Sequence, residues 1–348
     1  MSTTATNAVP PLLPESSPPT TVLAAFRRFV RWDGFGLLLV FILLYVVLSV
    51  MAPEFLTADN QLNILQNAAF FGIVALIMTL VIISGEIDIS VGSMAALASS
   101  MLGVAVIKLG VPMPIAVVIV LAVAFAIGSL AGFVRAYFGV PTFIATLALY
   151  LALRGLAQLL TNNFPLPIPL NQFFYWGSGK IQIPVGPTSV FNIPVPAIYF
   201  VVLFIIVAIV AKKTVFGRSI YAVGGNIKAA NLSGINVRRV KILVMALAAT
   251  AAAITGLLFS AQVQSGNSTI ANGLEFDAIA ATIIGGAALS GGKGTVVGTV
   301  LGVLFIAALL NGMVLLNVNP YAQQVVRGAV VLIAVLVNVF RTRRSTVS

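Results

Sequence analysis

Long uninterrupted apolar runs dominate this chain. A run of about 20 residues is what an α-helix needs to cross a hydrocarbon core about 30 Å thick. The runs are continuous rather than alternating, which argues against a transmembrane β-barrel. Composition agrees, because 60% of the residues are hydrophobic and only 8% are charged, far from the balance of a soluble globular domain. We therefore expect an all-α integral membrane protein.

About ten transmembrane helices are predicted, including broken or short ones. Eight runs are clear, near 35–51, 66–84, 113–134, 141–160, 194–211, 242–263, 296–316 and 323–340. Two more, 91–107 and 276–290, are shorter and richer in Gly, Ala and Ser. The sequence leaves open whether these two cross the membrane fully or re-enter it.

The basic residues predict the orientation, since cytoplasmic loops collect Lys and Arg. With the amino terminus inside, fifteen of the 19 basic residues fall on the cytoplasmic side, and only Lys108 and Lys180 fall outside. The remaining two, Arg154 and Arg327, lie inside predicted spans. Both termini are therefore expected to be cytoplasmic. A buried arginine needs a partner, so at least one of these two should contact a carboxylate or helix-end carbonyls.

The transmembrane domain, residues 35–340, is expected to lie between two cytoplasmic tails. Residues 1–34 are rich in Ser, Thr and Pro and predict a disordered tail with a basic amphipathic end, and residues 341–348 form a basic tail. Residues 161–193 form a proline-rich, non-helical external loop, whose aromatic residues suit either a docking cap or an interfacial anchor. Residues 212–241 carry seven basic residues and predict a cytoplasmic loop with a short amphipathic helix.

Several function classes are excluded by what the chain lacks. It contains no cysteine and no histidine, which removes disulfides, imidazole bases and the commonest zinc ligands, so we expect no metal site. The net charge of +11 follows the loop topology, which favours anionic lipid over nucleic acid. The segment before Lys293 is not a phosphate-binding loop, because Ala287 stands where the first glycine should be.

Acidic residues are rare, so the motif SGEIDISVG after the second apolar run is informative. Asp88 and Ser90 are expected to cap the next helix. A broken helix here could also shape a translocation path together with Glu86, and the two roles are compatible. Alternatively, Glu86 and Asp88 would serve as ion sites of a secondary transporter or channel. An intramembrane enzyme using Asp88 and Asp277 is a third hypothesis, but no catalytic signature accompanies either residue.

Glycines recur in two blocks and are assigned structural roles. Gly294, Gly298 and Gly302 repeat every fourth residue, a spacing that brings helix backbones close together. The other structural glycines are Gly85, Gly92, Gly285, Gly286, Gly291 and Gly292.

Three motifs in order give the chain a resemblance to a known family. They are GEIDISVGSMAALAS, FGRSIYAVGGNIKAANLSGINVRRVKI and LEFDAIAATIIGGAALSGGKGTVVGTVLG. Over roughly residues 35–340 the chain resembles the permease subunits of ribose-type ABC sugar importers. Two positions depart from the family pattern, with Lys228 in place of a common Glu and Arg135 in place of Asn. Lys228 suggests a dedicated ATPase partner.

The resemblance implies a multi-pass protein of the bacterial inner membrane that works as a dimer, with an identical or paralogous second permease chain. It implies a cytoplasmic ABC ATPase subunit, which would bind the ATP and magnesium, and an external sugar-binding protein; no cofactor is expected on this chain. The permease would import a sugar or sugar-like solute by alternating access. Contacts with the ATPase are assigned to Gly217, Arg218, Lys228, Ala229, Ala230 and Gly234.

Candidates for the translocation path follow from the need of a sugar for polar partners beside aromatic or apolar walls. They are chosen from spans near the acidic motif or in the same half of the chain. The candidates are Asn67, Phe70, Phe71, Glu86, Asp88, Ser90, Phe143 and Thr146.

Overall fold

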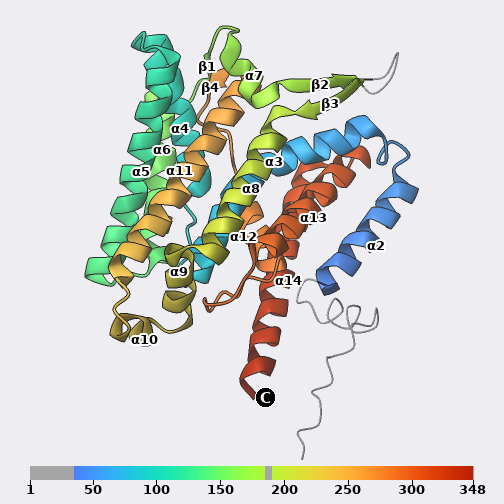
Figure 1. Ribbon diagram of the computed structural model, residues 1–348. Coiled ribbons are helices and arrows are strands. Elements are labelled where there is room, and N and C mark those ends of the chain that lie inside the picture. The colour runs from blue at the N-terminus through green and yellow to red at the C-terminus, as the bar shows by residue number, and fades with distance from the viewer. Residues whose placement is uncertain (1–34, 185–189, 348) are drawn as a thin grey trace, which may run out of the picture.

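A computed structural model describes residues 35–184 and 190–347, and within them the fold is a bundle of long helices (Figure 1). Each of the ten predicted segments contains a helix. These are α2 (Phe35–Met51), α3 (Ala58–Ile83), α4 (Val91–Gly103), α5 (Met113–Phe138), α6 (Thr142–Thr161), α8 (Val195–Lys213), α11 (Val237–Val263), α12 (Leu274–Ile284), α13 (Val296–Leu315) and α14 (Pro320–Val347). The prediction of an all-α membrane protein is confirmed, with eight described helices long and apolar enough to span a membrane.

The two segments that the sequence left open differ from each other. α4 continues through a π-helical turn, Val104–Lys108, and the combined 18 residues are long enough to span. α12 has only 11 residues and ends at Ile284, so the run predicted to reach residue 290 is shorter than expected. Gly286 follows with a φ of 96°, a backbone conformation that suits glycine and ends the helix.

α3 and α11 form the centre of the bundle. In α3 nearly every residue from Ala68 to Ile83 is buried, whereas α14 is mostly exposed along its apolar length. Small residues bring α5 and α11 together: a side chain at Gly128 or Gly132 would overlap the α11 backbone at Met245 or Ile242. Such close backbone approach is the usual way in which membrane helices gain packing contacts.

The segment predicted as a non-helical external loop contains regular structure. The short helix α7 (Gln172–Ser178) carries the aromatic group, and β2 (Lys180–Pro184) pairs antiparallel with β3 (Val190–Pro194). Two shorter strands, β1 (Leu166–Pro167) and β4 (Ser265–Gly266), pair nearby. The expectation of no helix was wrong, because the prolines lie outside α7 and Asn171 caps its first turn through the Phe173 N–H.

The segment predicted as a basic loop between spans contains two short helices, α9 (Val215–Gly225) and α10 (Ile227–Leu232). Gly234 was expected inside the amphipathic helix, but it follows α10 with a φ of 80°. Figure 1 shows α9 and α10 at one end of the bundle with the C-terminal end of α14, and the β2–β3 hairpin at the other end. We call these the α10 end and the hairpin end.

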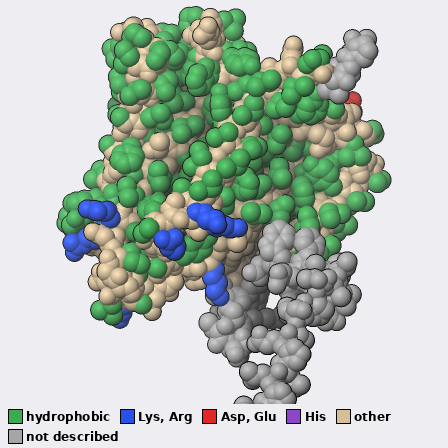
Figure 2. Space-filling model, in the orientation of Figure 1, with side chains coloured by type: hydrophobic (Ala, Val, Ile, Leu, Met, Phe, Trp, Pro, Cys, Tyr) green, Lys and Arg blue, Asp and Glu red, His purple; other side chains and the backbone are tan. Residues whose placement is uncertain are grey.

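Basic side chains gather at the α10 end, as Figure 2 shows for one face of the molecule. The topology predicted from charge requires the 212–241 segment and the C-terminal region to lie on one side, and both lie at this end. Which end faces the cytoplasm stays a prediction. α14 continues through residues 341–347, which were expected to be a tail. The predicted disordered tail, residues 1–34, lies outside the described residues.

Candidate functional site

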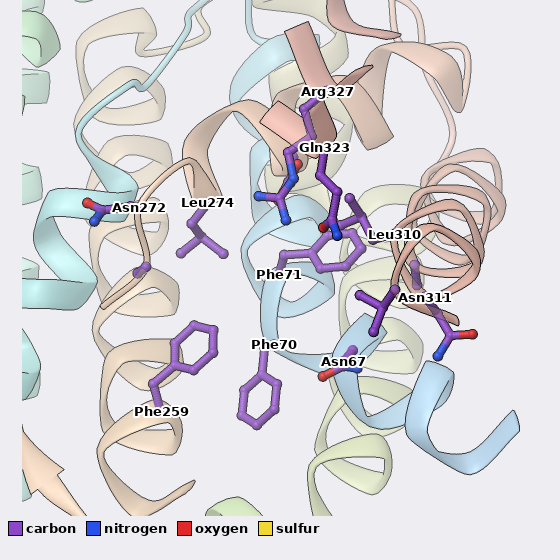
Figure 3. Close-up of a pocket in the computed structure, with 14 residues that line it drawn as sticks. Asn67, Phe70, Phe71, Phe259, Asn272, Leu274, Leu310, Asn311, Gln323 and Arg327 are labelled. Carbon is purple, nitrogen blue, oxygen red and sulfur yellow. The ribbon is translucent and has the colours of Figure 1, made fainter. Parts of the chain in front are cut away.

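A cavity of about 370 Å³ lies in the half of the bundle nearer the hairpin end (Figure 3). Its wall combines α3, the end of α11, the segment after α11, the start of α12, the second half of α13 and the start of α14. The lining residues are Asn67, Phe70, Phe71, Phe259, Ala271, Asn272, Leu274, Asp277, Ala307, Leu310, Asn311, Val314, Gln323 and Arg327. The cavity therefore brings together residues that are up to 260 positions apart in the chain.

Aromatic rings form the apolar part of the wall. Phe70 of α3 and Phe259 of α11 are stacked with ring centroids 4.6 Å apart and an interplanar angle of 14°. Phe71 lies beside them on α3 and is also buried. Asn67, one turn earlier on the same helix, is exposed, as is Asn272 on the α11–α12 connection. The cavity thus has an apolar interior and amide groups at its rim.

An ion pair lies in the polar part of the wall. The Arg327 guanidinium of α14 contacts the Asp277 carboxylate of α12 at 3.2 Å. The side chain of Arg327 is one-third exposed, whereas that of Asp277 is mostly buried. The prediction that an intramembrane arginine contacts a carboxylate or carbonyls is confirmed here. It is confirmed again at Arg154, whose Nη1 donates to the carbonyls of Ser268 and Ile270 at 2.9 Å.

A pair of asparagines links the wall of the cavity to the start of α3. The Asn60 and Asn311 amides hydrogen-bond to each other in both directions, at 3.0 and 2.8 Å. The Asn60 amide also donates to the carbonyl of Phe55. Asn311 lies on α13 and lines the cavity, so this pair holds its wall to the start of α3.

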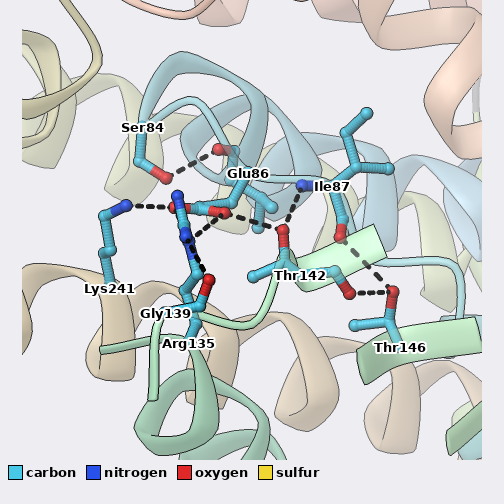
Figure 4. Close-up of polar contacts among 9 residues, drawn as sticks. Ser84, Glu86, Ile87, Arg135, Gly139, Thr142, Thr146 and Lys241 are labelled. Atoms are coloured by element: carbon cyan, nitrogen blue, oxygen red, sulfur yellow. Dashed lines mark hydrogen bonds and ion pairs between the residues drawn. The ribbon is translucent and has the colours of Figure 1, made fainter. Parts of the chain in front are cut away.

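A second polar cluster lies where α3 ends, toward the α10 end (Figure 4). Glu86 accepts from Arg135 Nε at 2.9 Å, from Thr142 Oγ1 at 2.7 Å and from Lys241 Nζ. Arg135 belongs to the end of α5, Thr142 to the start of α6, and Lys241 to the start of α11. We call Glu86, Arg135, Thr142 and Lys241 the Glu86 network. It joins the ends of four helices through one buried carboxylate.

Lys241 and Arg135 were counted among the basic residues of the cytoplasmic side, and their contact with a buried carboxylate was not predicted. Lys241 is buried, with only 6% of its side chain exposed, because it faces Glu86 from the first turns of α11. Arg135 stands at the position where the family pattern has Asn, and it is one of the two cations that neutralise Glu86.

Threonine hydroxyls of α6 accept hydrogen bonds from backbone N–H groups in the unwound segment between α3 and α4. The N–H of Ile87 donates to Thr142 Oγ1 at 3.3 Å, and the N–H of Ile89 donates to Thr146 Oγ1 at 3.2 Å. Asp88 accepts from both the N–H and the hydroxyl of Ser90, at 2.8 and 2.6 Å. Asp88 therefore caps this turn, but the expected capping by the Ser90 side chain is wrong, since its hydroxyl donates to Asp88.

The structure separates the predicted path residues into three groups. Asn67, Phe70 and Phe71 line the cavity. The acidic-motif residues and Thr146 lie in or next to the Glu86 network. The Phe143 side chain is half-exposed and does not line the cavity, although its carbonyl accepts from Thr146 Oγ1 at 3.4 Å. Sequence reasoning missed Phe259, Asn311 and Gln323; an amide inside the apolar run 296–316 was a usable signal for Asn311.

The residues assigned to ATPase contact divide by exposure. Arg218, Lys228, Ala229 and Gly234 are exposed, whereas Gly217 and Ala230 are buried. Gly217 packs against the last carbonyls of α8, where a larger residue would overlap them. Leu232 was predicted to belong to the amphipathic helix but not to this set, and its side chain is 89% exposed at the end of α10. We call Arg218, Lys228, Ala229 and Leu232 the α10 surface.

The helices that carry the α10 surface are tied to the bundle by backbone contacts. Gly224 of α9 approaches the carbonyl of Ile83 too closely for any side chain. That carbonyl accepts from the N–H of Gly292 at 2.8 Å, and the Tyr221 hydroxyl donates to the carbonyl of Gly294 at 2.9 Å. Burial raises the pKa of the Tyr221 hydroxyl, which keeps it protonated as a donor.

The glycines predicted to be structural occupy tight positions. Gly298 and Gly302 of α13 abut the carbonyls of Gly285 and Ala281, so they pack α13 against α12 as expected. Gly294 precedes α13 and does not belong to that face. A side chain at Gly92 would overlap the Glu275 carboxylate. The remaining ones have positive φ angles and form turns: Gly85, Gly286, Gly291 and Gly292.

Comparison with known proteins agrees with this architecture. A family model described as the permease component of the branched-chain amino acid transport system matches residues 60–335. The chain is 48% identical over 324 residues to the probable ABC transporter permease protein YphD of Escherichia coli K12, covering 92% of this chain and 95% of that protein. No solved structure matches the chain.

Two further relatives have names that state a sugar. The chain is 39% identical over 309 residues to the ribose import permease RbsC of Escherichia coli K12, covering 86% of this chain and 92% of that one. It is 35% identical over 358 residues to the xylose transport system permease XylH of Haemophilus influenzae, covering 86% and 96%. The chain therefore belongs to the family of ABC importer permeases, and within it to the sugar permeases of the inner membrane.

Proposed function

We propose that the chain is the permease subunit of an ATP-driven importer that moves a sugar or sugar-like solute by alternating access. A cytoplasmic ABC ATPase would hydrolyse ATP with magnesium and dock on the α10 surface. An external binding protein would deliver the solute at the hairpin end, and a second permease chain would complete the transporter. The chain itself is not an enzyme in this proposal.

The exposed α10 surface is the observation that carries the proposal. Leu232 presents an apolar side chain with 89% exposure at the end of α10, one helical turn after the exposed Lys228, and Arg218 of α9 is a second exposed cation. An exposed apolar side chain within a polar rim is typical of a protein contact. The helices under it contact the end of α3 at Ile83, so a docked partner would act on the central helix of the bundle.

A pull-down from native membranes tests this surface. The wild-type chain should retain an ABC ATPase that mass spectrometry identifies, and Leu232→Glu should lose it because a charge enters the apolar contact. Leu170→Glu is the matched control, since Leu170 is 74% exposed near the hairpin end. Ala230→Glu is a poor probe, because Ala230 is buried and its replacement would disturb α10 itself. No ATPase with the wild-type chain would contradict the proposal.

The alternative, an ion-coupled transporter using Glu86 and Asp88, has weaker support. Glu86 is neutralised by two cations and Asp88 accepts two hydrogen bonds from Ser90. Neither carboxylate lines the cavity. Among the described residues no group of acidic side chains is arranged to hold a metal ion. A mobile ion would therefore have to displace groups already in place.

A further inference from the structure

We propose that Arg154 is a latch with two positions. In this conformation it holds the α11–α12 connection, residues 264–273, and when the connection moves it pairs with the Glu275 carboxylate instead. The latch controls how the cavity opens, because the connection forms part of the cavity wall. This inference rests on the proposed function and deepens it, since alternating access requires a wall that opens and closes.

The α11–α12 connection forms one side of the cavity. Ala271 and Asn272 line the cavity, and Leu274 continues the lining at the start of α12. Figure 3 shows Asn272 and Leu274 on the side of the cavity opposite Asn311 of α13. A movement of the connection would therefore widen or narrow the cavity.

Arg154 of α6 holds the connection by its backbone. Its Nη1 donates to the carbonyls of Ser268 and Ile270, both at 2.9 Å. Its Nη2 is buried and has no hydrogen-bond partner among the described residues. A guanidinium suits either of the proposed partners, because its planar fork of N–H groups can bind two carbonyls or one carboxylate.

The two halves of the connection differ in how they are tied to the bundle. The first half, residues 264–268, also makes hydrogen bonds with α4, α6 and β1. The second half, residues 269–273, makes hydrogen bonds within the connection and with the first turn of α12. Within the described part of the chain, the bond from Arg154 to Ile270 is the only one that ties the second half to any other element. The second half is therefore the part that Arg154 can release.

Glu275 is a buried carboxylate with no partner. It belongs to the first turn of α12, its side chain is 0% exposed, and neither oxygen has a hydrogen-bond partner among the described residues. The N–H groups of Gly273 and of Glu275 itself lie near the carboxylate without reaching hydrogen-bonding geometry. On the α4 side Gly92 packs so closely that any side chain there would overlap Glu275 Oε2.

The charges of Glu275 and Arg154 attract each other, although the two side chains form no ion pair within the described structure. A buried carboxylate without a counter-charge is costly, and a guanidinium with a free donor lies within its field. The attraction therefore pulls Arg154 away from the carbonyls that it now holds.

The backbone beside these carbonyls is held in an unusual conformation. Ala271 has a φ of 58°, in the left-handed region that residues with a β-carbon rarely adopt. Such a conformation persists only where the surrounding structure holds it, and it is frequent in switch segments. Ala271 directly follows Ile270, so release of the Ile270 carbonyl would let this residue relax.

The two positions of Arg154 are balanced against each other. In the first, the carbonyls of Ser268 and Ile270 are paired and Glu275 is not. In the second, Glu275 gains a charge-assisted partner and the Ile270 carbonyl turns to water at the rim, where Asn272 is already exposed. Each position leaves one group without Arg154, so a modest input of free energy can shift the equilibrium.

Cysteine labelling measures how often the cavity opens. The chain has no cysteine, so Ala307→Cys places a single thiol on the buried part of the wall formed by α13. A bulky maleimide reaches this thiol only when the cavity widens. Rates are measured on the full-length chain in lipid nanodiscs. Val314→Cys, at the exposed edge of the cavity, should label at the same rate in every variant.

The two latch residues should change the labelling rate in opposite directions. Glu275→Gln removes the charge that draws Arg154 away, so the connection stays held and the rate should fall about three- to tenfold. Arg154→Gln removes the hold on the carbonyls, so the rate should rise by a similar factor. Each factor corresponds to the net contribution of about one hydrogen bond.

Two matched controls remove a charge without touching the connection. Lys108→Gln frees another carbonyl from a cation, since Lys108 Nζ donates to the carbonyl of Leu160 at 3.0 Å. Glu54→Gln removes an exposed carboxylate. Both should label as the wild type does. Rates that shift in the same direction in Glu275→Gln and Arg154→Gln would mean that both residues only stabilise the fold, and would overturn the latch.

The double variant tests whether Glu275 acts through Arg154. Without Arg154 there is no cation for Glu275 to draw, so Arg154→Gln combined with Glu275→Gln should label at the rate of Arg154→Gln alone. A further fall in the double variant would show that Glu275 acts through another group, such as a bound water, and would contradict the inference.

Failure of the proposed function would look different. In the complex with the retained ATPase, ATP should change the labelling rate of the wild type, and Glu275→Gln should reduce that change. A wild-type chain that retains no ATPase would refute the importer, while opposite shifts in the two single variants would still support the latch. Equal rates in all variants beside ATP-driven transport would refute the latch alone.

Discussion

The two polar clusters of the bundle, the Glu86 network and the cavity wall, contain similar residues but differ in how completely their charged and hydrogen-bonding groups are paired. In the Glu86 network one carboxylate accepts from two cations and a threonine, and almost nothing is left open. In the cavity, an acidic residue has a single cation, the amides lie at an open rim, and about 370 Å³ stays unfilled. A rare acid in an apolar bundle can therefore mark either a structural joint or a site.

The difference shows that rarity alone does not identify function. An ionised side chain in a membrane protein is costly, and its presence calls for an explanation. At Glu86 the explanation is structural, because all the charge is used to join α3, α5, α6 and α11. At Asp277 the charge is only partly used, beside space that a ligand can fill. Four predictions separate the two cases.

The largest expected loss of stability is that of the Glu86→Ala variant. It leaves Lys241 and Arg135 facing each other without a counter-charge, and breaking a buried pair in this way costs about 3–5 kcal/mol. Thermal unfolding in detergent, followed by size-exclusion chromatography, measures the loss. Glu54→Ala is the control, because Glu54 is exposed. If the Glu86→Ala protein were as stable as the wild type, the Glu86 network would not be needed to hold the four helix ends together.

The second largest effect is a partial recovery of stability. We expect it when Lys241→Met is added to Glu86→Gln. The single Glu86→Gln variant strands a buried ammonium group, and the second change removes that group while keeping the side-chain length. The two changes should therefore couple by about 0.5–3 kcal/mol in a double-mutant cycle. Additive losses would mean that Lys241 and Glu86 do not depend on each other.

A smaller stability effect is expected at Arg327→Gln in the cavity. Arg327 is one-third exposed at an open cavity, so its pairing with Asp277 should contribute no more than about 1 kcal/mol. Solute import should nevertheless fall, because the cation both holds Asp277 and faces the cavity. Unfolding and import are measured on the same preparation. A loss of stability as large as that of Glu86→Ala would place Arg327 among the structural joints.

The smallest stability effect is expected for Asn67→Leu. The side chain is exposed and makes no contact that the fold depends on, so unfolding should change by less than about 0.5 kcal/mol. Normal stability together with impaired import is the combination that distinguishes a ligand site from a joint. A strongly destabilised Asn67→Leu protein would contradict the difference between the two clusters.

The sequence predicted the helices well, because length and apolarity determine which segments can span a membrane. It predicted the partners of those helices poorly. Glu86 pairs with Lys241, 155 positions away, and a count of charges by loop could only place Lys241 in a loop. α12 was overestimated because the residues after Gly285 are also small and apolar, although positive φ angles end the helix there.

The residues of the candidate site also differ in how well the sequence predicted them. Asn67, Phe70 and Phe71 were found from one helix, where spacing places them on neighbouring faces. Phe259 and Gln323 come from helices whose position relative to α3 follows only from packing. The exposure of Leu232 could not be predicted from the sequence either. Ala230, two positions earlier, is also apolar, yet it is buried. Orientation within a short helix depends on what the helix packs against.

The contact between Gly224 and Ile83 has a mechanical consequence. α3 contains no proline and is one unbroken helix from Asn67 to Ile83, a length of about 24 Å at 1.5 Å per residue. One end of this rod touches the helices under the α10 surface, and the other end carries Asn67, Phe70 and Phe71. A displacement of Ile83 would therefore move Asn67, Phe70 and Phe71 with it, because the helix between them has no break that could absorb the motion.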